Sequence, residues 1–89
     1  MSVFVLYGTE GCHLCEQAQA LLVPVLDHVS VMSQTPMSLQ VQDIADSEAL
    51  VTRYGLRIPV LRDTATEQEL GWPFDQAQAF AFIQSCTGI

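Results

Sequence analysis

The chain begins with a short apolar run that leads, through a glycine-containing loop, into an amphipathic helix. Residues 3–7 are apolar, β-branched or aromatic without interruption, which is typical of a strand buried on both faces. Apolar side chains then recur at helical spacing, so we expect a helix from Cys12 or His13 to Asp27. Pro24 lies inside this helix and predicts a kink or a loosened last turn.

The rest of the chain predicts three more strands and two more helices. We expect a connection over residues 28–37, strands at residues 38–43, 58–62 and 67–72, and helices at residues 47–54 and from residue 76 onward. Asp46 is the expected N-cap of the first of these helices, and Gly55 its expected C′ residue. Asp75 and Gln78 have capping-box spacing at the start of the last helix.

This element order, β-α-β-α-β-β-α, restricts the topology of the chain. A chain of 89 residues forms one core, so we expect a single domain over residues 1–89. A strand, a helix and a strand in one sheet form a right-handed parallel unit, whereas a tight turn between strands gives an antiparallel pair. The predicted fold class is therefore α/β, a four-stranded mixed sheet flanked by three helices.

This topology also predicts where a functional site lies. Binding and catalytic sites in open sheets lie beyond the carboxyl ends of parallel strands, and Cys12 follows the first strand.

Two cysteines, Cys12 and Cys15, lie three residues apart at the predicted start of the first helix. The helix N-terminus favours a thiolate, so we expect the pKa of Cys12 to lie below the usual value of about 8.5. One helical turn separates the two sulfurs, which brings them close enough to bond. We predict that Cys12 attacks a disulfide and that Cys15 resolves the mixed disulfide. An imidazolium at His13 would favour the thiolate, whereas the carboxylates of Glu10 and Glu16 oppose it.

Other chemistry remains open for the same pair. Zinc sites also use Cys-x-x-Cys, but a closed structural site needs four ligands, and His28 and Cys86 supply no second pair spacing. We therefore expect no metal site, although a metal or iron–sulfur carrier stays as an alternative. A non-catalytic binding or adaptor module is another. Cys86 alone is interpreted as a small packed hydrophobe.

The charge of the chain restricts its partners. The formal net charge is −7, with three arginines and no lysine, so neither nucleic acid nor an anionic membrane surface is an expected partner. A basic protein partner remains open. No apolar run reaches the eighteen residues of a membrane span, and the start lacks the basic residues of a signal peptide. We expect a cytoplasmic monomer whose chain begins at Met1.

Several motifs coincide along the whole chain: a strand, Cys12-His13-Leu14-Cys15 opening a helix, the stretch 54–59 before a strand, then a hairpin and a last helix. In this combination the chain resembles the thioredoxin superfamily, and its length and immediate first strand are most similar to small bacterial glutaredoxin-like proteins. The resemblance implies a thioredoxin-like (glutaredoxin-like) fold. It also implies a thiol–disulfide oxidoreductase in cell redox homeostasis, with a disulfide-containing protein or glutathione as partner.

The resemblance further implies site residues away from the cysteines. Pro59 would be a cis-proline beside the cysteine pair, and the backbone N–H and C=O of Ile58 would pair with an extended, cysteine-containing substrate. Arg57 would meet a carboxylate of glutathione, and Asp75 with its helix N-terminus would hold the amino end. No bound cofactor is implied, and glutathione is the candidate reductant.

Overall fold

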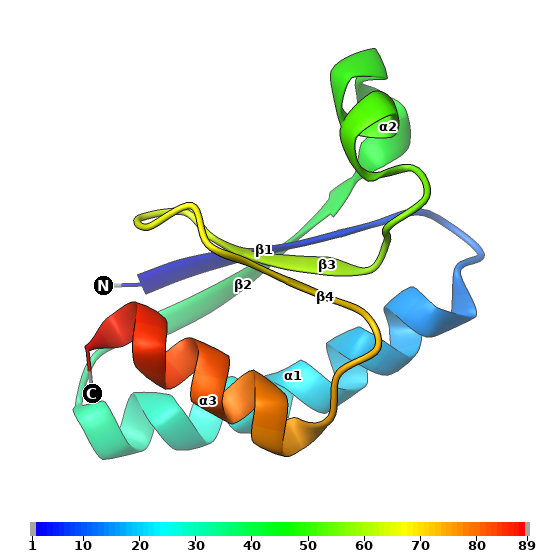
Figure 1. The fold of residues 1–89 in the computed structure, drawn as a ribbon. Coiled ribbons are helices and arrows are strands. Elements are labelled where there is room, and N and C mark those ends of the chain that lie inside the picture. The colour runs from blue at the N-terminus through cyan, green and yellow to red at the C-terminus, as the bar shows by residue number, and fades with distance from the viewer. Residues whose placement is uncertain (1, 89) are drawn as a thin grey trace.

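Four strands and three α-helices make up the chain in the computed structural model, which describes residues 2–88 (Figure 1). The elements are β1 (Ser2–Gly8), α1 (His13–Ser33), β2 (Met37–Asp43), the 3-10 helix η1 (Ile44–Asp46), α2 (Glu48–Tyr54), β3 (Val60–Asp63), β4 (Glu69–Gly71) and α3 (Gln76–Thr87). This order confirms the predicted β-α-β-α-β-β-α arrangement. The predicted domain also includes Met1 and Ile89, which lie outside the described residues. None of the helices within residues 2–88 is long and apolar enough to cross a membrane.

The sheet is mixed and has the strand order β2-β1-β3-β4. β1 runs parallel to β2, with Ser2 opposite Met37 and Gly8 opposite Asp43. β3 is antiparallel to both of its neighbours, β1 and β4. Because β1 and β2 end at the same edge of the sheet, the loop that carries the cysteines starts beside the end of β2.

The helices cover the two faces of the sheet unequally. In Figure 1, α1 and α3 lie together on one side of the sheet, and α2 lies on the other. The larger core fills the α1–α3 side and contains Phe4, Leu6, Ala18, Leu22, Val25, Leu26, Val29, Leu61, Phe74, Ala79 and Ile83. A smaller cluster of Ile44, Tyr54 and Val60, joined by Tyr7, lies under α2. Leu6 and Tyr7 are therefore on opposite faces of β1, as the alternation of a strand requires.

Helix α1 is longer than expected, and the predicted connection over residues 28–37 was wrong in its first part. The helix passes through Pro24 and ends at Ser33, where Gln34 takes the left-handed cap conformation with φ 54°. Val29 is fully buried and continues the apolar stripe of the helix by one more turn. The hydroxyl of Ser33 donates to the carbonyl of Val29 at 2.8 Å, so this serine is compatible with the last turn.

Helix α2 ends at Tyr54 as expected, but it begins one residue later than expected, at Glu48, and its cap residues differ from those predicted. Ser47, not Asp46, is its N-cap: the Ser47 hydroxyl accepts from the N–H of Leu50 at 3.4 Å, while Asp46 lies in η1. Gly55 keeps a right-handed conformation with φ −53° rather than the left-handed one of a C′ glycine. A glycine is needed at position 55 because there is no room for a side chain: a Cβ there would lie 2.5 Å from the carbonyl oxygen of Val51.

The hairpin strands are shorter than expected, and the last helix begins as expected. β3 starts at Val60 rather than residue 58, because the N–H of Ile58 bonds to the carbonyl of Tyr54 at 3.1 Å instead of joining the sheet. The side chain of Asp75 accepts from the N–H of Gln78, and the Gln78 side chain accepts from the N–H of Asp75. The predicted capping box is thus confirmed.

Candidate redox site

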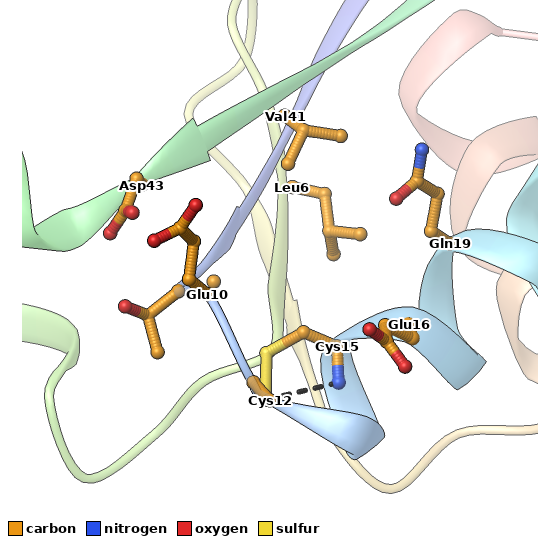
Figure 2. Close-up of a pocket in the computed structure, with 10 residues that line it drawn as sticks. Leu6, Glu10, Cys12, Cys15, Glu16, Gln19, Val41 and Asp43 are labelled. Carbon is orange, nitrogen blue, oxygen red and sulfur yellow. Dashed lines mark hydrogen bonds between the residues drawn. A yellow bond between two sulfur atoms is a disulfide. The ribbon is translucent and has the colours of Figure 1, made fainter.

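The loop between β1 and α1 places Cys12 at the N-terminus of the helix. Gly11 has φ +73°, a left-handed conformation that glycine adopts without strain, and it turns the chain into α1. Cys12 is the N-cap, and its Sγ accepts a hydrogen bond from the N–H of Cys15 at 3.1 Å (Figure 2). The sulfur therefore occupies the place where a capping oxygen usually meets the unpaired N–H groups of a helix.

Cys12 and Cys15 are joined by a disulfide in this structure, with their Cα atoms 5.2 Å apart. The two sulfurs differ in access, since Cys12 is half-buried whereas Cys15 is only 8% exposed. A reagent or substrate approaching the opened pair would reach Cys12 first. The order of attack by Cys12 and resolution by Cys15 stays a prediction.

Gly8, the last residue of β1, lets the strand pass close to the buried cysteine. A Cβ at this position would lie 3.0 Å from the Sγ and 3.1 Å from the Cβ of Cys15. Any larger residue would push against the pair. Sequence reasoning treated this glycine only as a strand end, although its place between a buried strand and a Cys-x-x-Cys motif was the available signal.

The segment before β3 reaches the same end of the sheet. The register pairs Tyr7 with Val60. Gly8 follows Tyr7 and Pro59 precedes Val60, so these two residues lie opposite each other, at the point where Gly8 approaches Cys15. Pro59 is buried, and its peptide bond to Ile58 is cis. The peptide bond between Trp72 and Pro73 is also cis, a feature that sequence reasoning did not address.

The backbone of Ile58 is only partly available for a substrate strand. Its N–H donates to the carbonyl of Tyr54 at 3.1 Å, so it is engaged within the protein. The carbonyl of the next residue, Pro59, accepts from the N–H of Trp72 at 3.1 Å. An extended substrate would therefore meet the carbonyl of Ile58 rather than the donor–acceptor pair that the resemblance implies.

His13 extends into solvent rather than across the cysteines. Its side chain is 89% exposed, and Nδ1 lies 3.7 Å from Oε2 of Glu16, one helical turn away. When protonated, the imidazolium thus has a carboxylate partner on the surface. The negative charge of Glu16 therefore offsets part of the effect that the imidazolium has on the Cys12 thiolate.

Both residues that the resemblance implies for glutathione have structural partners. Nη2 of Arg57 lies 2.9 Å from Oε1 of Glu69. Asp75 caps α3 by accepting from the N–H of Gln78 at 2.7 Å. Either side chain would have to share or give up its partner in order to hold a tripeptide.

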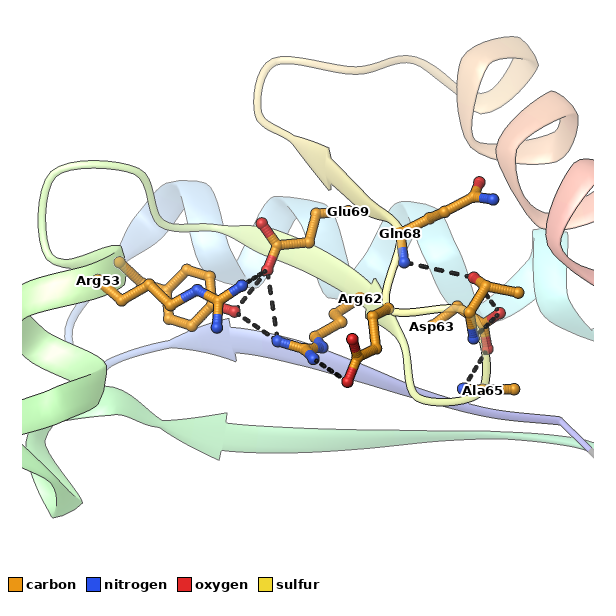
Figure 3. Close-up of polar contacts among 9 residues, drawn as sticks. Arg53, Arg62, Asp63, Ala65, Gln68 and Glu69 are labelled. Carbon is orange, nitrogen blue, oxygen red and sulfur yellow. Dashed lines mark hydrogen bonds and ion pairs between the residues drawn. The ribbon is translucent and has the colours of Figure 1, made fainter.

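A cluster centred on Glu69 gathers all three arginines of the chain. Figure 3 shows Arg53 and Arg62 beside Glu69. The Glu69 carboxylate lies 3.4 Å from Arg53 and 3.7 Å from Arg62, in addition to its contact with Arg57, and it accepts a hydrogen bond from the Tyr54 hydroxyl. Burial on its own would raise the pKa of Glu69, but the hydrogen bonds from Tyr54 and Arg57 outweigh it and lower this pKa. Burial raises the pKa of Tyr54, and the hydrogen bond to Glu69 raises it further.

Sequence reasoning missed this cluster. Its members become neighbours only through the antiparallel register, which places Arg62 opposite Glu69. The available signal was that all arginines fall within residues 53–62, just before two glutamates. The cluster ties α2 and the segment leading to Ile58 onto β4.

A pocket with a volume of about 230 Å³ opens beside the disulfide. Both cysteines line it, together with Leu6, Glu10, Glu16, Gln19, Val41 and Asp43, all of which Figure 2 labels. Gln19, Val41 and Asp43 come from α1 and β2, and their approach follows from the parallel β1–β2 register that puts Asp43 opposite Gly8. The sequence offered no direct signal for these three.

Cys86 lies apart from the cysteine pair, on α3. Within residues 2–88 no group of three or more His, Cys, Asp or Glu side chains is placed to hold a metal ion. Cys86 is half-buried on α3, with the Thr66 hydroxyl and Gln68 Oε1 about 4 Å away. Burial raises the pKa of the Cys86 thiol, which makes it a poor nucleophile at neutral pH.

Comparison with known proteins relates the chain to one family and to solved structures. Residues 3–84 match the family model described as Glutaredoxin-like domain (DUF836). An X-ray structure of a structural-genomics target protein from X. campestris is 35% identical, with a TM-score of 0.75, over 92% of this chain and 96% of that one. A solution NMR structure of a protein from Nitrosomonas europaea is 32% identical, with a TM-score of 0.66, over 91% and 89% of the two chains. No significant match was found among curated proteins.

Proposed function

The chain belongs to the family of glutaredoxin-like domains (DUF836), and on this basis we propose that it is a cytoplasmic, monomeric thiol–disulfide oxidoreductase that acts through Cys12 and Cys15. The observation that carries the proposal is the state of the pair. Both cysteines lie at one helix start, close enough to be disulfide-bonded, and Cys12 is half-buried whereas Cys15 is buried.

The proposed reaction starts from the reduced pair. The Cys12 thiolate attacks one sulfur of a substrate disulfide, forming a mixed disulfide and releasing the other substrate sulfur as a thiolate, which takes up a proton. Cys15 then loses its proton and attacks Sγ of Cys12, which releases the second substrate thiol. Two electrons pass to the substrate, and the protein is left with the Cys12–Cys15 disulfide that the structure contains. Two molecules of an external thiol, with glutathione as the candidate, return the pair to the reduced form and are themselves joined as a disulfide.

The helix start supports the first step of this reaction. The N–H of Cys15 donates to Sγ of Cys12, and hydrogen bonds to a charged acceptor are stronger than those to a neutral one. The partial positive charge of the helix N-terminus acts in the same direction. Both effects stabilise the Cys12 thiolate as nucleophile and as leaving group.

Substrate binding at Ile58 and Pro59 is part of the same proposal. The pairing of Tyr7 with Val60, one residue from Gly8 and from Pro59, supports this part of the proposal, in which an extended substrate lies along the segment and bonds to the carbonyl of Ile58. For glutathione, Arg57 would contact a carboxylate and Asp75 the amino end. In the present structure Glu69 and the N-terminus of α3 hold these two side chains, so glutathione competes with internal partners.

One observation favours a second function, a binding or adaptor module without efficient turnover. Glu10 and Glu16 both line the pocket at the cysteines, and negative charge there opposes the thiolate. If this opposition prevails, Cys12 would react slowly and the fold would serve binding alone.

Alkylation of the reduced protein at different pH values, combined with a redox titration of the pair, separates these functions. Iodoacetamide rates for Cys12, measured in Cys15→Ser, should rise to a plateau with a midpoint below about 8.5, the value of an ordinary thiol. The wild-type pair should form its disulfide under mild oxidant. A midpoint at or above that value, together with a pair that stays reduced, would exclude the oxidoreductase.

A further inference from the structure

The pocket beside the disulfide combines apolar walls with acidic groups. Leu6 and Val41 provide apolar surface, and three acidic residues, Glu10, Glu16 and Asp43, belong to the same lining. Among the residues that the structure describes, 2–88, no lysine, arginine or histidine lines it. Because both reactive cysteines share the lining, whatever fills this pocket lies directly beside the reacting sulfurs (Figure 2).

Within residues 2–88, the cationic side chains leave most of this negative charge uncompensated. All three arginines are paired with Glu69, and Arg62 also with Glu67, on the β3–β4 side of the molecule. The only cationic partner of a pocket acid within residues 2–88 is His13, whose contact with Glu16 is 3.7 Å long and solvent-exposed. Asp43 uses Oδ1 to accept from the N–H of Ala45, and this hydrogen bond leaves its charge in place.

We propose that this pocket receives a lysine or arginine side chain that flanks the reacting cysteine of a protein disulfide. The inference deepens the proposed function and rests on it. Lysine and arginine have an apolar stem and a cationic head, and both prefer to lay the stem on apolar surface while the head stays polar. Leu6 and Val41 suit the stem, and Glu10, Glu16 and Asp43 suit the head.

The charge of the whole chain acts in the same direction. A net charge of −7 accelerates the encounter with a cationic partner and slows that with an anionic one. Glutathione carries two carboxylates against one ammonium group, so it is disfavoured both at long range and in the pocket. The preferred oxidised substrate is thus a basic protein segment, and glutathione is the poorer one.

The test uses synthetic peptides whose single cysteine forms a mixed disulfide with 2-thiopyridine. Three peptides differ only in the residue beside the cysteine, which is Lys, Gln or Glu, and a second set places this residue on the other side. Reduced protein is mixed with each peptide, and release of pyridine-2-thione gives the rate constant of attack by Cys12. We expect the Lys peptide to react about fivefold faster than the Glu peptide in at least one set, the size of one good exposed ion pair.

Variants then separate the pocket from the total charge. Glu10→Gln, Glu16→Gln and Asp43→Asn each remove one pocket charge, and Asn retains the cap to Ala45. Asp27→Asn is the matched control, because it removes the same charge from an exposed position of α1 about 12 Å along the helix from Gln19. The Lys-to-Glu rate ratio is compared within each variant, so that a general change in thiolate reactivity cancels.

The outcomes are distinct. A Lys-to-Glu rate ratio that falls about twofold or more in the pocket variants, and stays unchanged in Asp27→Asn, supports binding of the basic side chain in the pocket. Equal rates for the three peptides, or a ratio that falls equally in the control, would overturn it while leaving the oxidoreductase intact. No reaction with any peptide would be a failure of the proposed function itself.

Discussion

Replacing Glu69 by glutamine removes one charge from the point where three guanidinium groups and one phenol converge. The Glu69 side chain is 16% exposed, with carboxylate oxygens 2.9 Å from Arg57, 3.4 Å from Arg53 and 3.7 Å from Arg62. The Tyr54 hydroxyl donates to the same carboxylate. Glutamine has the same shape but presents an amide group to the cations, so Glu69→Gln is expected to destabilise the fold.

The magnitude follows from the exposure of the partners. Arg53 and Arg57 are about half exposed, and pairs of this kind contribute about 0.2–1 kcal/mol each. A hydrogen bond to a charged acceptor exceeds a neutral one by roughly 1 kcal/mol, which is lost at Tyr54. Together these terms amount to about 2 kcal/mol, which corresponds to a decrease in Tm of about 8–16 °C for a domain of this size.

Thermal and urea unfolding of the oxidised protein would measure this effect, with Glu67→Gln as the matched control. The side chain of Glu67 is 75% exposed, and its only ion pair within residues 2–88 is the one with Arg62, at 3.3 Å. Its replacement should therefore change the free energy of unfolding by less than about 0.5 kcal/mol. Equal stability of the two variants would refute the assignment of Glu69 as the centre of the cluster.

The effect should also depend on pH. The pKa of Glu69 is lowered in the folded state, so its ionised form stabilises the fold above the unfolded-state pKa of about 4.3. This stabilisation is lost as the pH falls through the lower, folded-state pKa. The difference between wild type and Glu69→Gln should therefore be complete at neutral pH and shrink below about pH 4.

Two further substitutions test the site and its surroundings. Gly8→Ala places a Cβ 3.0 Å from Sγ of Cys15 and should lower the free energy of unfolding, measured in urea, by about 1–3 kcal/mol. Gly71→Ala is the control, because a Cβ at that position meets no described atom within 4 Å, and it should change the free energy of unfolding by less than about 0.5 kcal/mol. Equal effects of the two substitutions would contradict the close approach of Gly8 to Cys15. Asp75→Ala should cost about 1 kcal/mol through loss of the cap to Gln78, whereas Asp75→Asn should not. If Asp75 holds the amino end of glutathione, Asp75→Asn should reduce glutathione-dependent turnover at unchanged stability, and unchanged turnover would exclude that role.

Local patterns predicted the part of the site that depends on local structure. The strand ending at Gly8, the glycine-containing loop and the helix beginning after Cys12 follow from periodicity and turn chemistry within some twenty residues. The position of the cysteine pair therefore needed no tertiary information. The end of α1 did need it: serine and threonine after residue 28 indicate a loop, but the burial of Val29 against the sheet outweighs this preference.

The remaining features depend on contacts between distant segments. Arg62 meets Glu69 only because β3 and β4 pair in one register, and a shift by one residue would place them on opposite faces. Asp43 reaches the cysteine pocket only because β2 ends beside Gly8. Sequence periodicity determines neither register, so the arginine cluster and the acidic pocket became visible only in the structure.

Trapping of the mixed disulfide tests the central claim most directly. The reduced Cys15→Ser variant is mixed with the Lys-flanked peptide disulfide, and the intact mass of the protein is measured. The control is Cys12→Ser, in which the serine remains a good N-cap. The account predicts one peptide adduct on Cys12 in Cys15→Ser, removed by dithiothreitol, and at most slow labelling of Cys12→Ser because Cys15 is 8% exposed. Absence of the adduct on Cys12, or equally fast labelling of Cys15, would contradict it.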